Sequence, residues 1–192
     1  MEERARRIVE TAVSLAEKGG FEAVRLRDVA SQAGVALGTL YRHFRSKEDL
    51  LMAALSLEAE ALLEQMQETP PNGSTPLERV TAYFAAATQA LCRKPKLARA
   101  VLRAGASGEP ELTEKLRRFH DICAEMAVAA LRGKSLGQEK PTELELRVSF
   151  LLHKLWFASL IGWMGGLHSQ ADVVEELRAA AELIIRGAEG NW

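Results

Sequence analysis

Apolar residues recur at intervals of three and four along almost the whole chain. Over residues 3–18, Ile8, Ala12, Leu15 and Ala16 form one stripe, and Gly19-Gly20 end it. This is the spacing of an amphipathic helix, and glycine is common just past a helix C-terminus. The same periodicity predicts helices over residues 26–33, around Leu40 and Phe44, and over 46–68, 76–93, 96–106, 111–132, 142–165 and 170–186. No segment alternates with a period of two, so the sequence predicts an all-α fold of about nine helices.

Two of these helices are short and are separated only by a turn at Gly34. Two short helices joined by a glycine-containing turn form a helix-turn-helix, whose second helix can lie in the DNA major groove. Leu40 and Phe44 anchor the second helix inward, so the polar positions between them must face outward: Thr39, Tyr41, Arg42 and His43. Such side chains suit phosphates and base edges. The pattern therefore predicts a DNA-binding module.

Several predicted helices begin with capping signals. Ser46 and Asp49 have capping-box spacing, with Asp in the place of Glu, and Thr142 with Glu145 has the same spacing. The clearest break in the chain is the Pro- and Gly-containing stretch 70–74. Lys47 lies in the first turn of a long helix, where the helix dipole disfavours a cation. An external anion such as a DNA phosphate would explain that placement.

The helix over 144–164 is apolar nearly all round, since only His153, Lys154 and Ser159 are polar between Phe150 and Met164. Such a helix must be covered on nearly every side. It is too short and too charged for a membrane span. A second copy of the chain can cover one side, and the apolar final helix over 170–186 can contribute. We therefore expect a homodimer formed through the last two helices.

Composition and charge limit the functions that the chain can have. The chain has 192 residues and a net charge of −1, and residues 1–50 carry nine Lys and Arg against eight Asp and Glu, which permits DNA binding without demonstrating it. Cys92 and Cys123 have no metal-like spacing, and the charged segment 1–10 does not resemble a signal peptide, so we expect reduced thiols in the cytoplasm. The four histidines form no ligand pattern, and no catalytic constellation stands out. We expect no metal, no cofactor and no enzyme activity.

A large helical region behind a DNA-binding module suggests that a ligand is sensed there. Large apolar walls with few polar groups describe a site for a bulky apolar molecule. The candidate lining residues are Tyr83, Phe84, Ala87, Leu91, Leu102, Phe119, Cys123, Met126, Leu152, Trp156 and Trp163. For any single one of them, ordinary core packing is the stronger interpretation. His153 has the same two interpretations, an anchor for a ligand carbonyl or a hydrogen-bonded core histidine.

Residues 7–55 resemble the DNA-binding region of the TetR family of bacterial repressors. The shared pattern is Gly20-Phe21, Arg27-Asp28-Val29-Ala30, Ala33-Gly34-Val35, Gly38-Thr39-Leu40-Tyr41, His43-Phe44 and Ser46-Lys47-Glu48-Asp49-Leu50. Two capping positions of the family pattern are replaced, by Arg25 and Ala36; Ala caps poorly, at a typical cost of about 1 kcal/mol. The resemblance implies a helix-turn-helix DNA-binding domain over 1–48 and a ligand-binding and dimerisation domain over 49–192.

Within the family, the chain is similar to actinobacterial repressors of steroid catabolism. The similarity lies in the runs 21–24 and 35–42 and in the segment around Trp156 and Trp163. It implies a dimer that binds a near-palindromic double-stranded DNA operator and is released by an apolar or acyl-CoA effector. Such a thioester would need a cation near the pocket mouth, for which Arg99, Arg103, Lys115 and Arg118 are candidates.

The candidate DNA contacts are Arg25, Arg27, Leu37, Gly38, Thr39, Tyr41, Arg42, His43 and Lys47. We expect phosphate contacts from Tyr41, Lys47, the two arginines before the turn and the backbone at the start of the second helix. We expect base edges to be contacted by Thr39, Arg42 and Leu37. An alternative is a lipid- or drug-binding protein whose DNA-binding module no longer functions. Whether the regulator represses or activates is open at this point.

Overall fold

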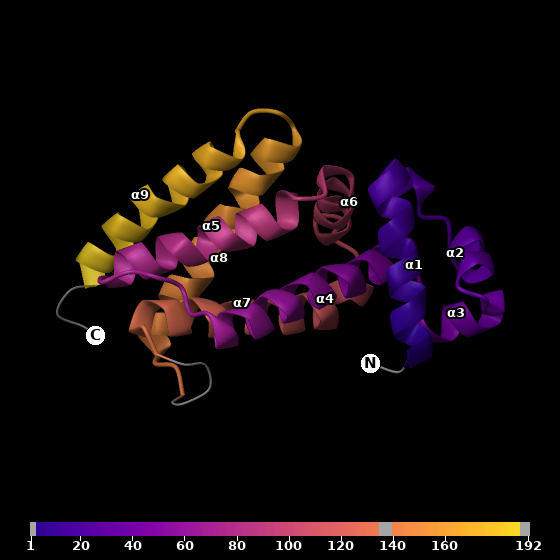
Figure 1. Ribbon diagram of the computed structural model, residues 1–192, viewed down its shortest axis with the longest axis horizontal. Coiled ribbons are helices and arrows are strands. Elements are labelled where there is room, and N and C mark those ends of the chain that lie inside the picture. Colours follow the sequence, from indigo (N-terminus) through magenta and orange to yellow (C-terminus); the bar gives the residue numbers. More distant parts are fainter. Residues whose placement is uncertain (1–2, 135–139, 189–192) are drawn as a thin grey trace. The chain divides into compact units, whose positions relative to one another are not determined.

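The computed structural model describes residues 3–134 and 140–188. Within these ranges there are nine α-helices, two short 3-10 helices and no strand (Figure 1). The elements in chain order are α1 (Glu3–Gly19), η1 (Phe21–Ala23), α2 (Leu26–Gln32), α3 (Leu37–His43), α4 (Lys47–Glu68), α5 (Pro76–Cys92), α6 (Pro95–Gly105), η2 (Pro110–Leu112), α7 (Thr113–Arg132), α8 (Glu143–Met164) and α9 (Gln170–Ala188). The predicted all-α fold is confirmed.

Two helix boundaries differ from the prediction for local reasons. The helix predicted from residue 96 begins one residue earlier, and Pro95 is the first residue of α6. Proline suits that position because it has no N–H to leave unpaired and its φ is already helical. The helix expected from residue 111 begins as the 3-10 turn η2, and α7 starts at Thr113. The segment between the helices predicted over 111–132 and 142–165 lies mostly outside the described residues.

The chain divides into two compact units. The first comprises Met1–Glu58 and Arg93–Phe119, and the second comprises Ala59–Cys92 and His120–Trp192. The division falls inside α4 and α7, so each of these helices contributes one part to each unit.

The first unit is built around α1. This helix contacts η1, α2, α3 and α6, and its apolar stripe is fully buried at Ile8, Val9, Ala12 and Ala16. Together with the apolar start of α4, this core gives the two short helices a fixed support. Short helices are marginal by themselves, so their order depends on that packing.

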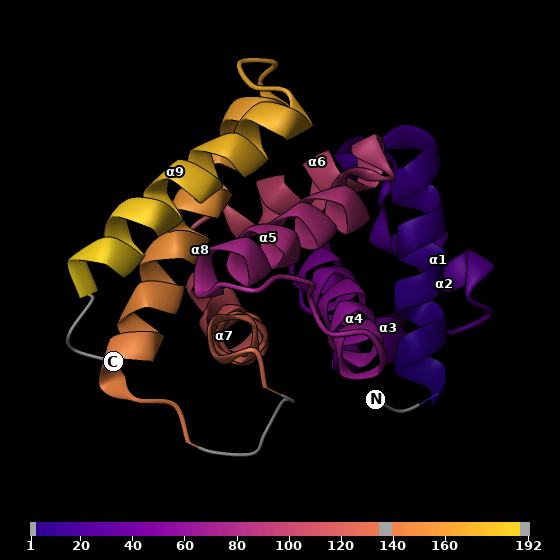
Figure 2. The same cartoon turned by 60° about the vertical axis from the view of Figure 1, so that its left-hand side comes forward.

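The second unit has its core between α5, α7, α8 and α9. α9 packs along both α5 and α8, and Figure 2 shows the three helices side by side. Helix α8 begins with the predicted capping box, in which Thr142 and Glu145 bond each other's backbone N–H. Both cysteines are buried free thiols, as expected. In the part of the chain that is described, no helix is long and apolar enough to cross a membrane.

A charged pair is buried where α7 ends and α8 begins. Arg132 donates from Nε to Glu145 Oε1 at 2.5 Å and from Nη2 to Oε2 at 2.7 Å. This fork, with the Thr142 cap, lowers the pKa of Glu145 to about 2. The pair joins two helices of the second unit through a carboxylate that must stay ionised.

Candidate nucleic-acid interface

The turn between α2 and α3 has the geometry that the sequence predicts. Gly34 has φ +66°, in the left-handed region where a side chain is strained. The chain then reverses, and Val35 N–H donates to Ala30 O at 3.0 Å. The two short helices contact each other across this turn. The helix-turn-helix is therefore present, and glycine is required at its turn.

Helix α3 has a buried side and an exposed side. Leu40 and Phe44 are buried, as predicted, while Tyr41 is 50% exposed. Arg42 is also exposed, and its Nη2 donates to Thr39 Oγ1 at 3.1 Å, one turn earlier. Gly38 is exposed and has open space around its Cα. Leu37, Thr39 and His43 are half-buried at the edges of this face.

The starts of both short helices lack a capping side chain, as the sequence suggested. Arg25 is the N-cap residue of α2 and Ala36 that of α3, and neither side chain bonds the helix backbone. Arg25 and Arg27 are both exposed. Uncapped amides at a helix start favour a nearby anion. Two exposed arginines at the start of α2 and the uncapped start of α3 are thus open to an anion.

Asp49 fixes the junction between α3 and α4. The Asp49 carboxylate is buried and accepts from Arg45 N–H at 3.0 Å, while Asp49 N–H donates to Ser46 Oγ at 3.0 Å. Lys115 of α7 forms an ion pair with the same carboxylate. The cap predicted at Ser46 and Asp49 is confirmed, with Arg45 rather than Ser46 as the backbone donor to the Asp.

Lys47 has a partner within the chain. Its Nζ lies 3.6 Å from Glu22 Oε2 and 3.8 Å from the centre of the Phe21 ring. The unfavourable place of Lys47 in the first turn of α4 is therefore offset internally, without the external anion that the sequence suggested. Arg103 of α6 meets the same two residues, donating to Glu22 Oε1 at 2.8 Å and lying 4.0 Å from the Phe21 ring. Local spacing does not reveal the role of Glu22, because its contact with Arg103 spans 81 positions.

The predicted ligand-lining residues fall in both units. Phe84, Ala87, Cys123, Met126, Leu152 and Trp156 are buried in the second unit, and Leu91 and Trp163 are half-buried there. Leu102 and Phe119 belong to the first unit. The rings of Phe84, His153 and Trp156 pack together, with centroids 5.1 to 6.2 Å apart. The buried members of this set that lie in the second unit fill its core.

A buried polar pair lies within this apolar core. Tyr83 OH is 2.9 Å from His153 Nε2, and His153 Nδ1 is 2.8 Å from Ser149 O. Since a carbonyl only accepts, Nδ1 carries the proton and Tyr83 donates to Nε2. Burial lowers the pKa of His153 to about 4, so the ring is neutral at pH 7. Of the two interpretations of His153, this geometry matches the hydrogen-bonded core histidine.

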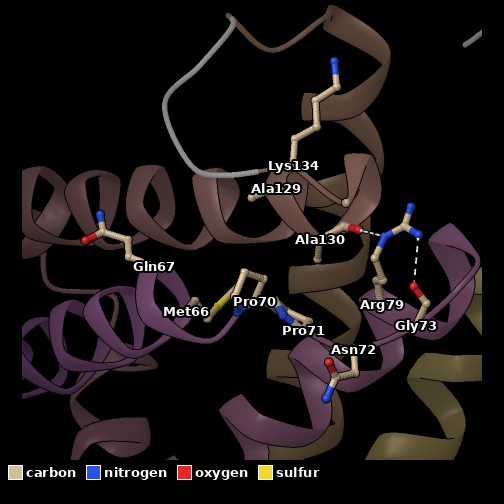
Figure 3. Close-up of a pocket in the computed structure, with 11 residues that line it drawn as sticks. Met66, Gln67, Pro70, Pro71, Asn72, Gly73, Arg79, Ala129, Ala130 and Lys134 are labelled. Atoms are coloured by element: carbon tan, nitrogen blue, oxygen red, sulfur yellow. Dashed lines mark hydrogen bonds between the residues drawn. The ribbon is translucent and has the colours of Figure 1, made fainter.

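A cavity of about 390 Å³ lies elsewhere in the second unit (Figure 3). Its walls are Met66, Gln67, Pro70, Pro71, Asn72, Gly73, Arg79, Ala129, Ala130, Gly133 and Lys134, which include none of the predicted lining residues. Arg79 spans it by donating to Ala130 O at 2.9 Å, Leu131 O at 2.9 Å and Gly73 O at 3.3 Å. These bonds cap the end of α7 and fix the loop before α5. Over the described ranges, no group of His, Cys, Asp and Glu could hold a metal ion.

Two family profiles match the chain. The profile of the bacterial regulatory proteins of the tetR family matches residues 8–54. The profile of the tetracyclin repressor-like C-terminal domain matches residues 73–184. The first match contains η1, α2, α3 and the start of α4, which together carry the exposed face of α3.

The chain is also similar to individual proteins along most of its length. It is 34% identical to the HTH-type transcriptional repressor KstR of Rhodococcus jostii over 183 residues, covering 95% of this chain and 83% of that protein. For KstR of Mycobacterium tuberculosis the identity is 31% over 189 residues, with 95% and 81% covered. These relatives are transcriptional repressors by name.

Two solved structures resemble the fold. A TetR transcriptional regulator from Rhodococcus sp. RHA1 superposes with a TM-score of 0.84 at 28% identity, covering 96% of this chain and 97% of that one. Thermus thermophilus FadR, a TetR-family repressor solved in complex with lauroyl-CoA, has a TM-score of 0.72 at 21% identity, with 95% and 94% covered. The second likeness is one of fold alone.

Proposed function

This chain belongs to the TetR family of transcriptional repressors, and from that premise we propose how it binds DNA, pairs with a second copy and responds to an effector. The observation that carries the proposal is the face of α3. Its polar side chains are held outward by two buried anchors, Leu40 and Phe44, within the segment that matches the family profile. The proposal places the protein in the cytoplasm, with its DNA.

In this proposal, DNA is contacted by residues of α2, α3 and the start of α4. Arg42 and Thr39 meet base edges, with Leu37 against a thymine methyl group. Tyr41, Lys47, Arg25 and Arg27 bind phosphates, with His43 at the edge of the same face. Gly38 allows the start of α3 to approach the DNA backbone closely. The DNA-binding domain is taken as residues 1–48 and the ligand-binding and dimerisation domain as 49–192.

The proposed dimer forms through α8 and α9. α8 exposes Leu146, Phe150 and Leu151, each between 45% and 50%, and α9 exposes Leu183 at 75%. Large apolar side chains gathered on two neighbouring helices favour a protein partner. A second copy supplies a matching surface under two-fold symmetry. Two copies also suit a palindromic operator with half-sites roughly 34–36 Å apart.

The proposed effector is a bulky apolar molecule, and an acyl-CoA thioester is the first class to test. The core of the second unit is mostly apolar and aromatic, and its buried polar groups include the Tyr83–His153 pair and the Trp156–Thr88 hydrogen bond. A fold of this kind has been solved with an acyl-CoA bound. Binding must favour one of two conformations to release DNA. The candidate contacts are the eight lining residues from Phe84 to Trp163 that lie in the second unit.

The test is a fluorescence anisotropy titration of the DNA upstream of the gene. It is run at two salt concentrations, with and without fatty and steroid acyl-CoAs. We expect tight, salt-sensitive binding that one thioester abolishes. Tight binding that no thioester alters would refute the effector class and keep the DNA-binding function. Weak binding, equal for random DNA, would favour a ligand-binding protein whose DNA-binding module does not function.

A further inference from the structure

Three charged side chains of the first unit gather around one aromatic ring. We call these four residues the charged cluster: Phe21, Glu22, Lys47 and Arg103. The two oxygens of Glu22 are divided between the cations, with Oε1 at 2.8 Å from Arg103 Nη1 and Oε2 at 3.6 Å from Lys47 Nζ. Both cations also lie over the Phe21 ring, at 4.0 Å and 3.8 Å from its centre. Two cations therefore share one carboxylate and one ring.

Arg103 and Lys47 do not contact the Glu22 carboxylate equally. The Arg103 contact is a hydrogen bond, whereas the Lys47 contact is a longer ionic one. The pKa of Glu22 is lowered first by the hydrogen bond from Arg103 and then by the charge of Lys47. With Arg103 in place, the shortest contact of the Glu22 carboxylate is to Arg103, and Lys47 is bound to it only by a longer ionic contact. If Arg103 were absent, the carboxylate would have Lys47 as its nearest cation.

We propose that Glu22 regulates how strongly Lys47 binds a DNA phosphate, and that Arg103 of α6 sets the share of Glu22 that Lys47 receives. The inference rests on the proposed function, since it takes Lys47 as a phosphate contact. Glu22 competes with DNA for Lys47, and Arg103 competes with Lys47 for Glu22. Arg103 is thus a positioning residue for DNA binding that touches no nucleotide itself.

Helix α6 is well placed to transmit a change to this cluster. It contacts α1 and η1. Near its start, Lys96 Nζ donates to Lys18 O at 2.7 Å and Lys94 pairs with Glu17 at 2.5 Å. Near its end, Arg103 reaches Glu22. A shift of α6 that lengthens the Arg103 contact would leave the carboxylate to Lys47 and weaken phosphate binding.

Two other interpretations of Arg103 make different predictions. If Arg103 bound a phosphate directly, its removal would weaken DNA binding whether or not Glu22 is charged. If Arg103 only tied α6 to η1, its removal would lower stability and leave the affinity of the folded protein unchanged. The proposal alone requires that the effect of Arg103 disappear when Glu22 loses its charge. A double-mutant cycle separates the three.

The experiment measures operator affinity by anisotropy for the unaltered protein, Arg103→Gln, Glu22→Gln and the double variant. We expect Glu22→Gln to bind about two- to fivefold tighter and Arg103→Gln about two- to fivefold weaker, the range of an exposed ion pair. The double variant should match Glu22→Gln. Arg93→Gln, which removes a cation from the same unit, is the charge control and should not show dependence on Glu22. Melting temperatures confirm that each variant is folded.

A second readout does not depend on DNA. The pKa of Glu22, followed by carboxyl NMR, should rise in Arg103→Gln and rise less in Lys47→Gln. Equal weakening by Arg103→Gln in both backgrounds, or unchanged affinity in Glu22→Gln, would overturn the inference. Failure of the unaltered protein to bind the operator would instead refute the proposed function. The operator affinity of the unaltered protein therefore distinguishes a failure of the inference from a failure of the proposed function.

Discussion

The two units present their candidate sites in opposite ways. In the first unit, the polar groups lie on an exposed helix face and the carboxylate shared by Lys47 and Arg103 is open to water, with Glu22 73% exposed. In the second unit, the candidate ligand residues are buried and packed, and the Glu145 side chain of its charged pair is only 8% exposed. An exposed polar face can meet a partner without rearrangement, whereas a packed apolar core must rearrange to admit a ligand.

The largest expected effect tests whether that core is tightly packed. Phe84 is fully buried, so Phe84→Ala should lower the free energy of unfolding by about 3–5 kcal/mol. Tyr41→Ala, at an exposed aromatic of the first unit, should change it by no more than about 0.5 kcal/mol. Urea denaturation measures both. A loss below about 1 kcal/mol for Phe84→Ala would mean that this region is loosely packed and already a cavity.

The buried pair of the second unit should dominate the acid sensitivity of folding. The pKa of Glu145 falls from 4.5 to about 2, so its contribution is present above pH 4.5 and is lost as the pH falls toward 2. By linkage, its contribution at pH 7 should be at most about 3 kcal/mol. Urea unfolding at several pH values between 7 and 2.5 measures it. Glu145→Gln should flatten the pH dependence in this window, and an unchanged slope in that variant would place the acid sensitivity elsewhere.

The fold and the exposed face of α3 could be predicted from the sequence because their signals are local. Gly34, Leu40 and Phe44 lie within eleven consecutive positions, and their spacing alone determines which side of α3 faces outward. Helix starts were predicted equally well where the cap lies within three residues, as at Thr142 and Glu145.

Local signals could not predict whether the apolar residues of the second unit line a ligand site. They could not predict the charged cluster either. Phe84 and Trp156 have the same periodicity whether they line a pocket or fill a core, and only packing distinguishes the two. Arg103 comes from a different helix than Glu22 and Lys47, so no spacing rule connects them. Long-range pairs of this kind depend on tertiary structure.

A third effect concerns the exposed face itself. Arg42→Ala should weaken operator binding by about 1–3 kcal/mol and relax specificity at one base position. Lys47→Ala should weaken binding to all sequences alike and reduce the salt dependence. Anisotropy against the operator and single-base variants distinguishes the two residues. If Arg42→Ala weakens every sequence equally, Arg42 is a phosphate contact and the base contacts lie with its neighbours.

The smallest effect separates stability from binding at a single methyl group. Gly38 lies in the first turn of α3, and a Cβ added there meets nothing within 4 Å. Gly38→Ala should therefore stabilise the fold by about 0.5–1 kcal/mol, the difference in helix propensity. If the DNA backbone approaches the start of α3 as proposed, the same methyl group must weaken operator binding. Gly187→Ala is a control for the stability effect alone, because Gly187 lies in α9 with equally open surroundings but α9 belongs to the proposed dimer surface. It should stabilise the fold similarly. Equal operator affinity in Gly38→Ala and the unaltered protein would mean that DNA does not come close to this turn. The phosphate contacts would then have to come from side chains, because the backbone at the start of α3 would be too far from the DNA.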